Sequence, residues 1–238
     1  ALAEEGCKLA ICARTKRDIM LAAEQIGTKH GVEVYADAID VEKRDQMRKF
    51  LAAVQKKYGG IHILVTNCGG PPHGKPLEFD DDEWDGAARS TLMAPINWMR
   101  AVAPLMVVQQ WGRIINIVSL AVKQPIDGLV LSNSMRMGVI GFAKTLAKEL
   151  APFRVTVNNL LPGLIHTDRL ANLAQARAKD AKSTPEEMLK RMAAEIPMGR
   201  LGSPDEFSAM VAFLASEKAS YVTGTSIQID GGLYKGMV

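Results

Sequence analysis

The sequence is short of cysteine, of unbalanced charge and of long apolar runs, and each shortage excludes a class of protein. Its 238 residues include three cysteines, Cys7, Cys12 and Cys68, which cannot all pair internally and lack the spacing of metal ligands. They are typical of reduced thiols in a cytoplasmic protein, and no metal site is predicted. A net charge of +3 is too small to indicate nucleic acid or an anionic membrane as a partner. No apolar run approaches the ~18 residues of a membrane span.

What the sequence does contain is a regular alternation of strand and helix patterns. At 47% hydrophobic residues, the chain can bury a sizeable core. The strand patterns lie at 8–13, 32–38, 61–66, 114–118, 155–161 and 226–230, and the helical patterns at 15–30, 41–58, 82–106, 132–150, 167–195 and 204–216. This alternation predicts an α/β fold whose parallel sheet is covered on both faces. Without a repeat or linker, we predict one domain over 1–238.

Residues 112–150 hold the strongest candidate site. The apolar run 114–118 is β-branched and follows Gly112, so it predicts a buried strand that presents Ser119 at its carboxyl end. Ligands of open α/β sheets bind at that end of the strands. On the following helix, Ser132 and Arg136 are four residues apart and share one face.

This stretch resembles the active-site segment of the short-chain dehydrogenase/reductase family, which places Ser after a strand and Tyr-x-x-x-Lys on the next helix. Aligning 136–139 with the family's Lys-Ala-Gly-Val puts Ser132 at the Tyr position and Arg136 at the Lys position, while Thr91 stands at the family's Asn. The resemblance implies a Rossmann-like doubly wound sheet and an NAD(P)(H)-dependent oxidoreductase acting on a carbonyl or hydroxyl group, most similar to 3-oxoacyl-acyl-carrier-protein reductases. It implies Ser119, Ser132, Arg136 and Thr91 as catalytic positions.

Further motifs match the family's cofactor site. Asn67-Cys68-Gly69 resembles its Asn-Ala-Gly, and 162–167 resembles its P-G-x-I-x-T, whose backbone and Thr hold the nicotinamide carboxamide. By the same resemblance, the implied cofactor-binding residues are Asp40, Val41, Asn67, Cys68, Gly69, Pro162, Gly163 and Thr167, with Arg136 on the nicotinamide ribose. Structural alternatives remain: a glycine turn at Gly69, a helix cap at Asp40 and another at Thr167.

Arg14 follows the second strand of the family pattern. An NAD-preferring site usually carries an acidic residue there for the ribose 2′-hydroxyl. A basic residue suits the 2′-phosphate, so NADP(H) is predicted over NAD(H). The alternative is a solvated helix start.

The substitutions at the catalytic positions leave two functions open. An aliphatic hydroxyl such as Ser132 is a far weaker acid than tyrosine, and Arg136 stays charged. The chain is therefore an oxidoreductase that takes its proton from another group, such as His73, Lys123 or a water held by Ser119 and Ser132, or a nucleotide-binding scaffold or regulatory subunit.

The family pattern also includes an opening segment that this sequence does not contain. The family opens with a strand and a glycine-rich T-G-x-x-x-G-x-G turn, and neither precedes Ala1. We therefore expect roughly 20 upstream residues and seven strands in the full-length protein.

The resemblance also implies a homotetramer or dimer and a carbonyl or acyl-thioester substrate. Residues 167–195, rich in Ala, Lys and Arg, are expected to form a mobile lid.

Overall fold

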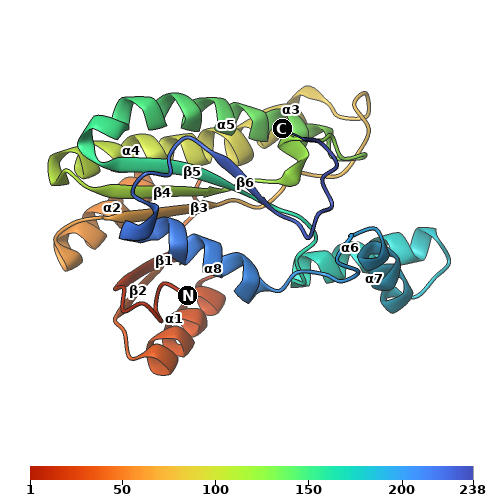
Figure 1. The fold of residues 1–238 in the computed structure, drawn as a ribbon, viewed down its shortest axis with the longest axis horizontal. Helices are drawn as coiled ribbons and strands as arrows, with labels where there is room; N and C mark the ends of the chain where they lie inside the picture. Colours follow the sequence, from red (N-terminus) through yellow and green to blue (C-terminus); the bar gives the residue numbers. More distant parts are fainter. Residues whose placement is uncertain (238) are drawn as a thin grey trace.

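Each predicted strand is present, and the strands form two parallel sheets (Figure 1). The structure, a computed structural model, describes residues 1–237. In one sheet β1 (Leu9–Ala13) pairs with β2 (Val34–Ala38). The other sheet has the order β3 (Ile63–Asn67), β4 (Gly112–Ile117), β5 (Val155–Pro162), β6 (Ser226–Ile229). The fold is therefore the α/β class that the sequence predicts.

Parallel pairing brings the carboxyl ends of the strands to one edge of each sheet. Asn67 is opposite Ile117, and Pro162 is opposite Ile229. Because the chain leaves every strand at such an edge, the loops that carry the predicted site residues share one side of the molecule.

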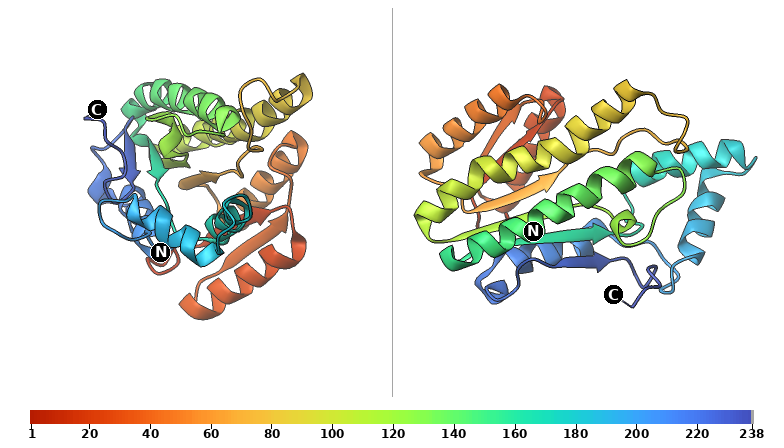
Figure 2. Two further views of the ribbon diagram at one scale, coloured as in Figure 1. Left: turned by 90° about the vertical axis from the view of Figure 1, so that its right-hand side faces the viewer. Right: turned by 90° about the horizontal axis from the view of Figure 1, so that it is seen from above.

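Within residues 1–237 the strands are connected and covered by eight α-helices: α1 (Lys16–His30), α2 (Arg44–Tyr58), α3 (Asp81–Ala87), α4 (Ala94–Gln109), α5 (Val130–Leu150), α6 (Asp168–Asp180), α7 (Pro185–Ala194) and α8 (Pro204–Ala215). Helices α4 and α5 lie on one face of the larger sheet and α8 on the other (Figures 1 and 2). Successive residues of β4 serve the two faces, since Ile114 belongs to the core under α4 and α5 and Ile115 to the core under α8. This two-sided burial explains the continuous apolar run.

The structure corrects several predicted helix boundaries. The helix predicted over 82–106 is interrupted by a π-helical segment, Ala88–Met93, which ends just before Pro95. Pro95 has no N–H to continue the α-helical ladder, so the preceding turn is widened. The predicted helix 167–195 is two helices, α6 and α7, and the residues before Gly6 form turns rather than a helix end. Helix α2 begins at Arg44, three residues later than predicted.

The two sheets do not join through β1 and β3. In the described part of the chain β1 pairs with β2 alone, and β3 pairs with β4 alone. Direct pairing of β1 with β3 would have contradicted the expectation of an additional central strand, and that pairing is not observed. The described residues form six strands, and the seventh strand of the full-length protein stays a prediction.

One helical stretch, Asp81–Gln109, is long and apolar enough by composition to cross a membrane. Its α4 part carries Met99, Val102 and Met106, each 0% exposed, into the core against β4 and α5. Packing inside the domain therefore accounts for its hydropathy.

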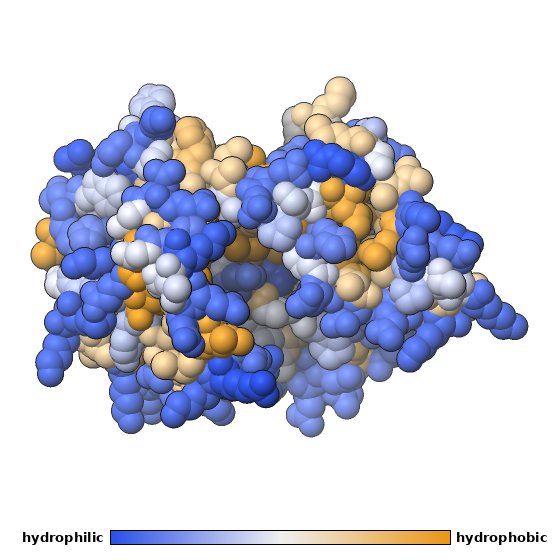
Figure 3. All heavy atoms as spheres, turned by 90° about the horizontal axis from the view of Figure 1, so that it is seen from below, coloured by the Kyte–Doolittle hydropathy of each residue, from blue (hydrophilic) through white to orange (hydrophobic). Residues whose placement is uncertain are grey.

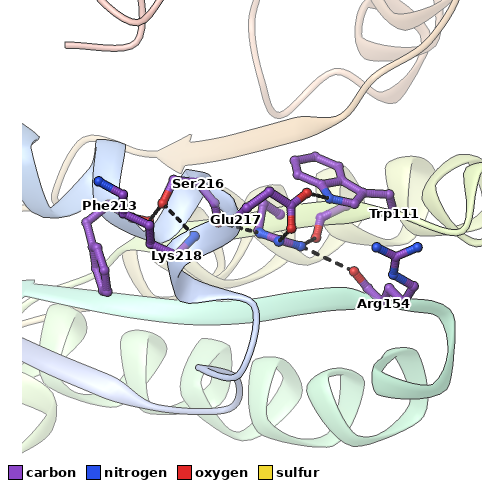
Figure 4. Close-up of polar contacts among 8 residues, drawn as sticks. Trp111, Arg154, Phe213, Ser216, Glu217 and Lys218 are labelled. Atoms are coloured by element: carbon purple, nitrogen blue, oxygen red, sulfur yellow. Dashed lines mark hydrogen bonds and ion pairs between the residues drawn. The ribbon is translucent and has the colours of Figure 1, made fainter.

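Arg113 links the amino end of β4 to the segments that follow α5 and α8. Figure 4 labels its partners Arg154, Ser216 and Glu217. Arg113 is 1% exposed, forms an ion pair with Glu217 at 3.5 Å, and lies 4.3 Å from the centre of the Trp111 ring. It also donates to the backbone carbonyls of Gly112, Arg154 and Ser216. Since these partners satisfy the buried guanidinium, Arg113 is a structural crosslink at the edge of the sheet opposite the candidate site.

Candidate active site

Arg136 is the best-connected residue of the candidate site. It is 8% exposed, and its Nε donates to Oγ of Ser132 at 3.1 Å, one helical turn earlier on α5. Its Nη1 donates to the carbonyl of Ile117 at 3.4 Å and its Nη2 to the carbonyl of Cys68 at 3.3 Å. Arg136 therefore ties α5 to the ends of β3 and β4. Burial lowers its pKa, and the charge of Arg169 lowers it further.

A small cavity lies beside Arg136. Its volume is about 10 Å³, close to the space of one water molecule. The lining residues are Thr66, Cys68, Thr91, Pro95, Asn116, Ile117, Val118, Arg136 and Val139. Thr91, 1% exposed, reaches the cavity from the π-helical segment, so the structure brings the predicted positions Thr91 and Arg136 to one space.

A chain of buried amides runs beneath this cavity, and the sequence analysis missed it. Thr66 Oγ1 donates to Asn116 Oδ1 at 2.7 Å, Asn116 Nδ2 donates to Asn159 Oδ1 at 3.0 Å, and Asn159 Nδ2 donates to Ser226 Oγ at 3.2 Å. The chain crosses β3, β4, β5 and β6, which fixes the relative positions of the strand ends. The available signal was an asparagine inside each of the apolar runs 114–118 and 155–161.

Ser119 follows β4, two residues after Ile117, at the predicted carboxyl end of the strand. Its Oγ accepts from the backbone N–H of Ala121 at 3.1 Å, and no hydrogen bond joins it to Ser132 within the described residues. Lys123, in the following loop, lies 5.4 Å from the centre of the Tyr234 ring, so the C-terminal segment packs over this loop. Within the described residues, the predicted catalytic positions Ser119, Ser132 and Thr91 are therefore not joined to one another by hydrogen bonds.

The predicted adenosine-side residues lie at the carboxyl ends of β1, β2 and β3. Arg14 is exposed directly after β1. Asp40 and Val41 follow β2, where Asp40 Oδ1 accepts from the backbone N–H of Glu42 at 3.0 Å, a turn rather than a helix cap. Asn67 ends β3 and is exposed, and Gly69 has open space on its Cβ side.

The nicotinamide-side motif follows β5. At Gly163 a Cβ would meet the Asp230 backbone at 2.7 Å, so glycine is required there by close packing after Pro162. Thr167 caps α6, since its Oγ1 accepts from the backbone N–H of Leu170 at 3.4 Å. The structural alternative for Thr167 is thus present, and a cofactor contact by the same hydroxyl stays a prediction.

His73 lies in the loop after β3, opposite the start of α6. Partial burial lowers its pKa, with further lowering from Arg169 and Arg177. The neutral imidazole is therefore favoured near pH 7, which reduces the population of an acidic His73 available as a proton donor.

The fold and this site define a nucleotide-binding α/β oxidoreductase. Residues 1–234 match the family model described as "Enoyl-(Acyl carrier protein) reductase". The chain is 34% identical to the 3-oxoacyl-[acyl-carrier-protein] reductase FabG of Staphylococcus epidermidis, covering 98% of this chain and 91% of that protein. It is 33% identical to the FabG protein of Aquifex aeolicus, covering 98% and 90%. The chain belongs to the short-chain dehydrogenase/reductase family of NAD(P)-dependent oxidoreductases.

Solved structures agree with this assignment. The NADPH-dependent reductase YwfH, involved in bacilysin biosynthesis, superposes with a TM-score of 0.94 at 31% identity, covering 99% of this chain and 92% of that chain. An actinorhodin polyketide ketoreductase with NADPH gives a TM-score of 0.92 at 30% identity, covering 98% and 89%. The chain is thus similar to NADPH-dependent reductases along nearly its whole length.

Proposed function

We propose that this protein is an NADP(H)-dependent reductase of a ketone carbonyl on a small molecule or acyl thioester. The observation that carries the proposal is the buried, charged Arg136 at the ends of β3 and β4, hydrogen-bonded to Ser132 and adjacent to Thr91. The similarity to 3-oxoacyl and polyketide ketoreductases supports a carbonyl substrate.

The residues present fit a dinucleotide at the carboxyl edge of the strands. Arg14 is exposed and forms no ion pair among the described residues, so its guanidinium is free for a 2′-phosphate. Gly69 leaves open space where a side chain would lie, and Val41 offers a half-buried apolar contact for the adenine. On the nicotinamide side, Arg136 uses three of its five N–H donors on protein groups, which leaves donors for a ribose hydroxyl.

When bound, NADPH supplies the hydride that reduces the carbonyl carbon. The protein must then stabilise the developing charge on the carbonyl oxygen and deliver one proton to it. Arg136 is suited to the first task, because a buried, permanently charged guanidinium stabilises an oxyanion without reorganisation. Ser132 accepts from Arg136 Nε, so its own hydroxyl hydrogen is left to bond the substrate oxygen.

The proton itself needs another source, because neither the Ser132 hydroxyl nor Arg136 releases a proton readily at neutral pH. Of the candidate donors, His73 is disfavoured by its lowered pKa. Lys123 and a water held by Ser119 or Ser132 remain. Water in the cavity beside Thr91 and Arg136 would connect this site to the buried amide chain.

A second function is favoured by the same substitutions. If no group supplies the proton, the protein is a nucleotide-binding scaffold or regulatory subunit.

We further propose that the protein is cytoplasmic and forms a homodimer or homotetramer. Light scattering at micromolar concentration tests the oligomeric state.

The decisive experiment combines binding with turnover in the full-length protein. NADPH fluorescence measures the dissociation constant, and absorbance at the nicotinamide band measures oxidation in the presence of an acetoacetyl thioester. Binding with turnover supports the reductase, and binding with no turnover on any ketone tested supports the scaffold. A protein that binds neither NADPH nor NADH contradicts both.

A further inference from the structure

The side chain of Arg169 crosses from the start of α6 to the loop after β3. Arg169 is exposed, and its guanidinium lies in the space that a Cβ on Gly70 would occupy, so a larger residue at position 70 would displace this flexible side chain. Arg169 is the second residue of α6, directly after the Thr167 cap. The contact therefore joins two loops that leave the sheet at the same edge, one after β3 and one after β5.

The guanidinium of Arg169 has no anionic partner in the described part of the chain. Two other arginines have a carboxylate partner: Arg113 pairs with Glu217, and Arg200 binds Glu206 through two hydrogen bonds. Arg169, by contrast, forms neither an ion pair with a carboxylate nor a hydrogen bond among the described residues, and its neighbour Asp168 does not pair with it. Five N–H donors are thus available at one point.

Other positive charges lie within electrostatic range of this region. The charge of Arg169 lowers the pKa of Arg136 and of His73, and Arg177, two turns further along α6, lowers that of His73 as well. The amino end of the 13-residue helix α6 adds its dipole. Like charges repel one another, so this convergence is unfavourable until an anion lies among them.

An anion bound at this position would also restrain helix α6. Helices α6 and α7 form an arm that projects from the sheets (Figures 1 and 2) and has its own small core around Leu170, Ala174 and Met192. The space-filling view shows the underside hollowed between this arm and the part formed by β1, β2 and α1 (Figure 3). A ligand bound by Arg169 and the 69–73 loop would hold the arm against the body of the protein.

We propose that Arg169 is an oxyanion-binding residue, whose guanidinium binds a phosphate or carboxylate between the start of α6 and the loop at 69–73. The inference rests on the proposed function, which would bring two anions to this place. They are the pyrophosphate of the cofactor, and a phosphate or carboxylate on the substrate. The shared chemistry is a planar guanidinium fork on two oxygens.

The experiment compares Arg169→Gln, Arg169→Lys and the control Arg191→Gln, which removes the same charge from another exposed site, on α7. Dissociation constants for NADPH and NADH are measured by fluorescence on the full-length protein. If the anion is the pyrophosphate, Arg169→Gln weakens both cofactors by about tenfold or more and leaves their ratio unchanged. Arg169→Lys gives an intermediate loss, and Arg191→Gln has no effect.

The substrate arm uses acetoacetate and its neutral ethyl ester, which present the same ketone with and without a carboxylate. If the anion belongs to the substrate, Arg169→Gln raises KM, or the dissociation constant measured by saturation-transfer NMR, for acetoacetate alone. A third arm follows the Arg169 Nε–H NMR signal as inorganic pyrophosphate is added, and expects a saturable shift.

These measurements distinguish a failure of the proposed function from a failure of the anion site at Arg169. A wild-type protein that binds no nicotinamide nucleotide overturns the proposed function, while the pyrophosphate titration still decides the anion site. Unchanged cofactor affinity, unchanged discrimination between acetoacetate and its ester, and no saturable shift at Arg169 would together overturn the assignment of Arg169.

Discussion

Arg136 donates through Nε to Oγ of Ser132 at 3.1 Å, and this bond joins the two positions at which the chain departs from its family's Tyr-x-x-x-Lys. The pair keeps the geometry of a residue and its partner one helical turn apart, with both side chains buried. It changes the chemistry, because a serine hydroxyl held by a guanidinium can orient and stabilise a carbonyl oxygen but is a poor source of protons.

Replacing Ser132→Tyr together with Arg136→Lys is expected to raise the rate of NADPH oxidation with an acetoacetyl thioester. A positioned general acid typically contributes ~10²–10⁴-fold, and each single replacement should give less because the pair acts as a unit. Both positions are buried, so circular dichroism must first confirm that the variants fold. Robust wild-type turnover that Ser132→Ala leaves unchanged would show that the proton comes from elsewhere, with Lys123→Ala as the next variant.

Arg14→Ala is expected to weaken NADPH about tenfold to one-hundredfold and to leave NADH nearly unchanged, because only NADPH carries the phosphate that a charge-assisted hydrogen bond recognises. Equilibrium fluorescence titration with both nucleotides gives the ratio. The matched control is Arg17→Ala, another exposed arginine three residues on. Equal affinities of the wild-type protein for the two cofactors would remove the basis for assigning this role to Arg14.

The predicted lid, 167–195, is expected to exchange its amide hydrogens faster than residues 114–118, because its core around Leu170, Ala174 and Met192 is small. The central strand has Ile114 at 0% and Ile115 at 1% exposure and is paired on both sides. Hydrogen exchange followed by mass spectrometry measures both segments in one experiment. Equal protection of the two segments would rule out a mobile lid.

Arg113→Met is expected to lower the free energy of unfolding by about 3 kcal/mol, because it strips the Arg154 and Ser216 carbonyls and the Glu217 carboxylate of a shared partner. Chemical denaturation measures the change. Arg48→Met, at an exposed ion pair of 3.9 Å, is the control and should cost no more than about 0.5 kcal/mol. A loss at Arg113 no larger than at Arg48 would mean that the crosslink contributes little.

His73 is expected to titrate below the ordinary histidine value, and Arg169→Gln is expected to raise its pKa by removing a nearby positive charge. NMR titration of the imidazole measures this, with Arg191→Gln as the variant that should leave it unchanged. Since the unfolded chain takes up this proton at higher pH than the folded chain, the contribution of His73 to stability is present above its ordinary pKa and is lost as the pH falls. A His73 titration indifferent to Arg169 would place the two residues further apart than the structure does.

The sequence by itself determined the fold class, because alternating apolar strands and amphipathic helices leave a parallel, two-sided sheet as the way to bury both patterns. It also placed Ser132 and Arg136 on one helical face, since a spacing of four residues does so in any α-helix. Local residue order likewise brought Ser119 to a strand end and Thr167 to the start of α6.

Only the tertiary structure decided what these residues touch. The amide chain through Asn116 and Asn159 joins residues 43 apart in sequence, and Arg136 reaches the Cys68 carbonyl across 68 positions. The contact of Arg169 with Gly70 depends on how the α6–α7 arm is oriented on the sheet. Such contacts are set by the packing of whole helices and strands against one another, which residue spacing along the chain does not specify.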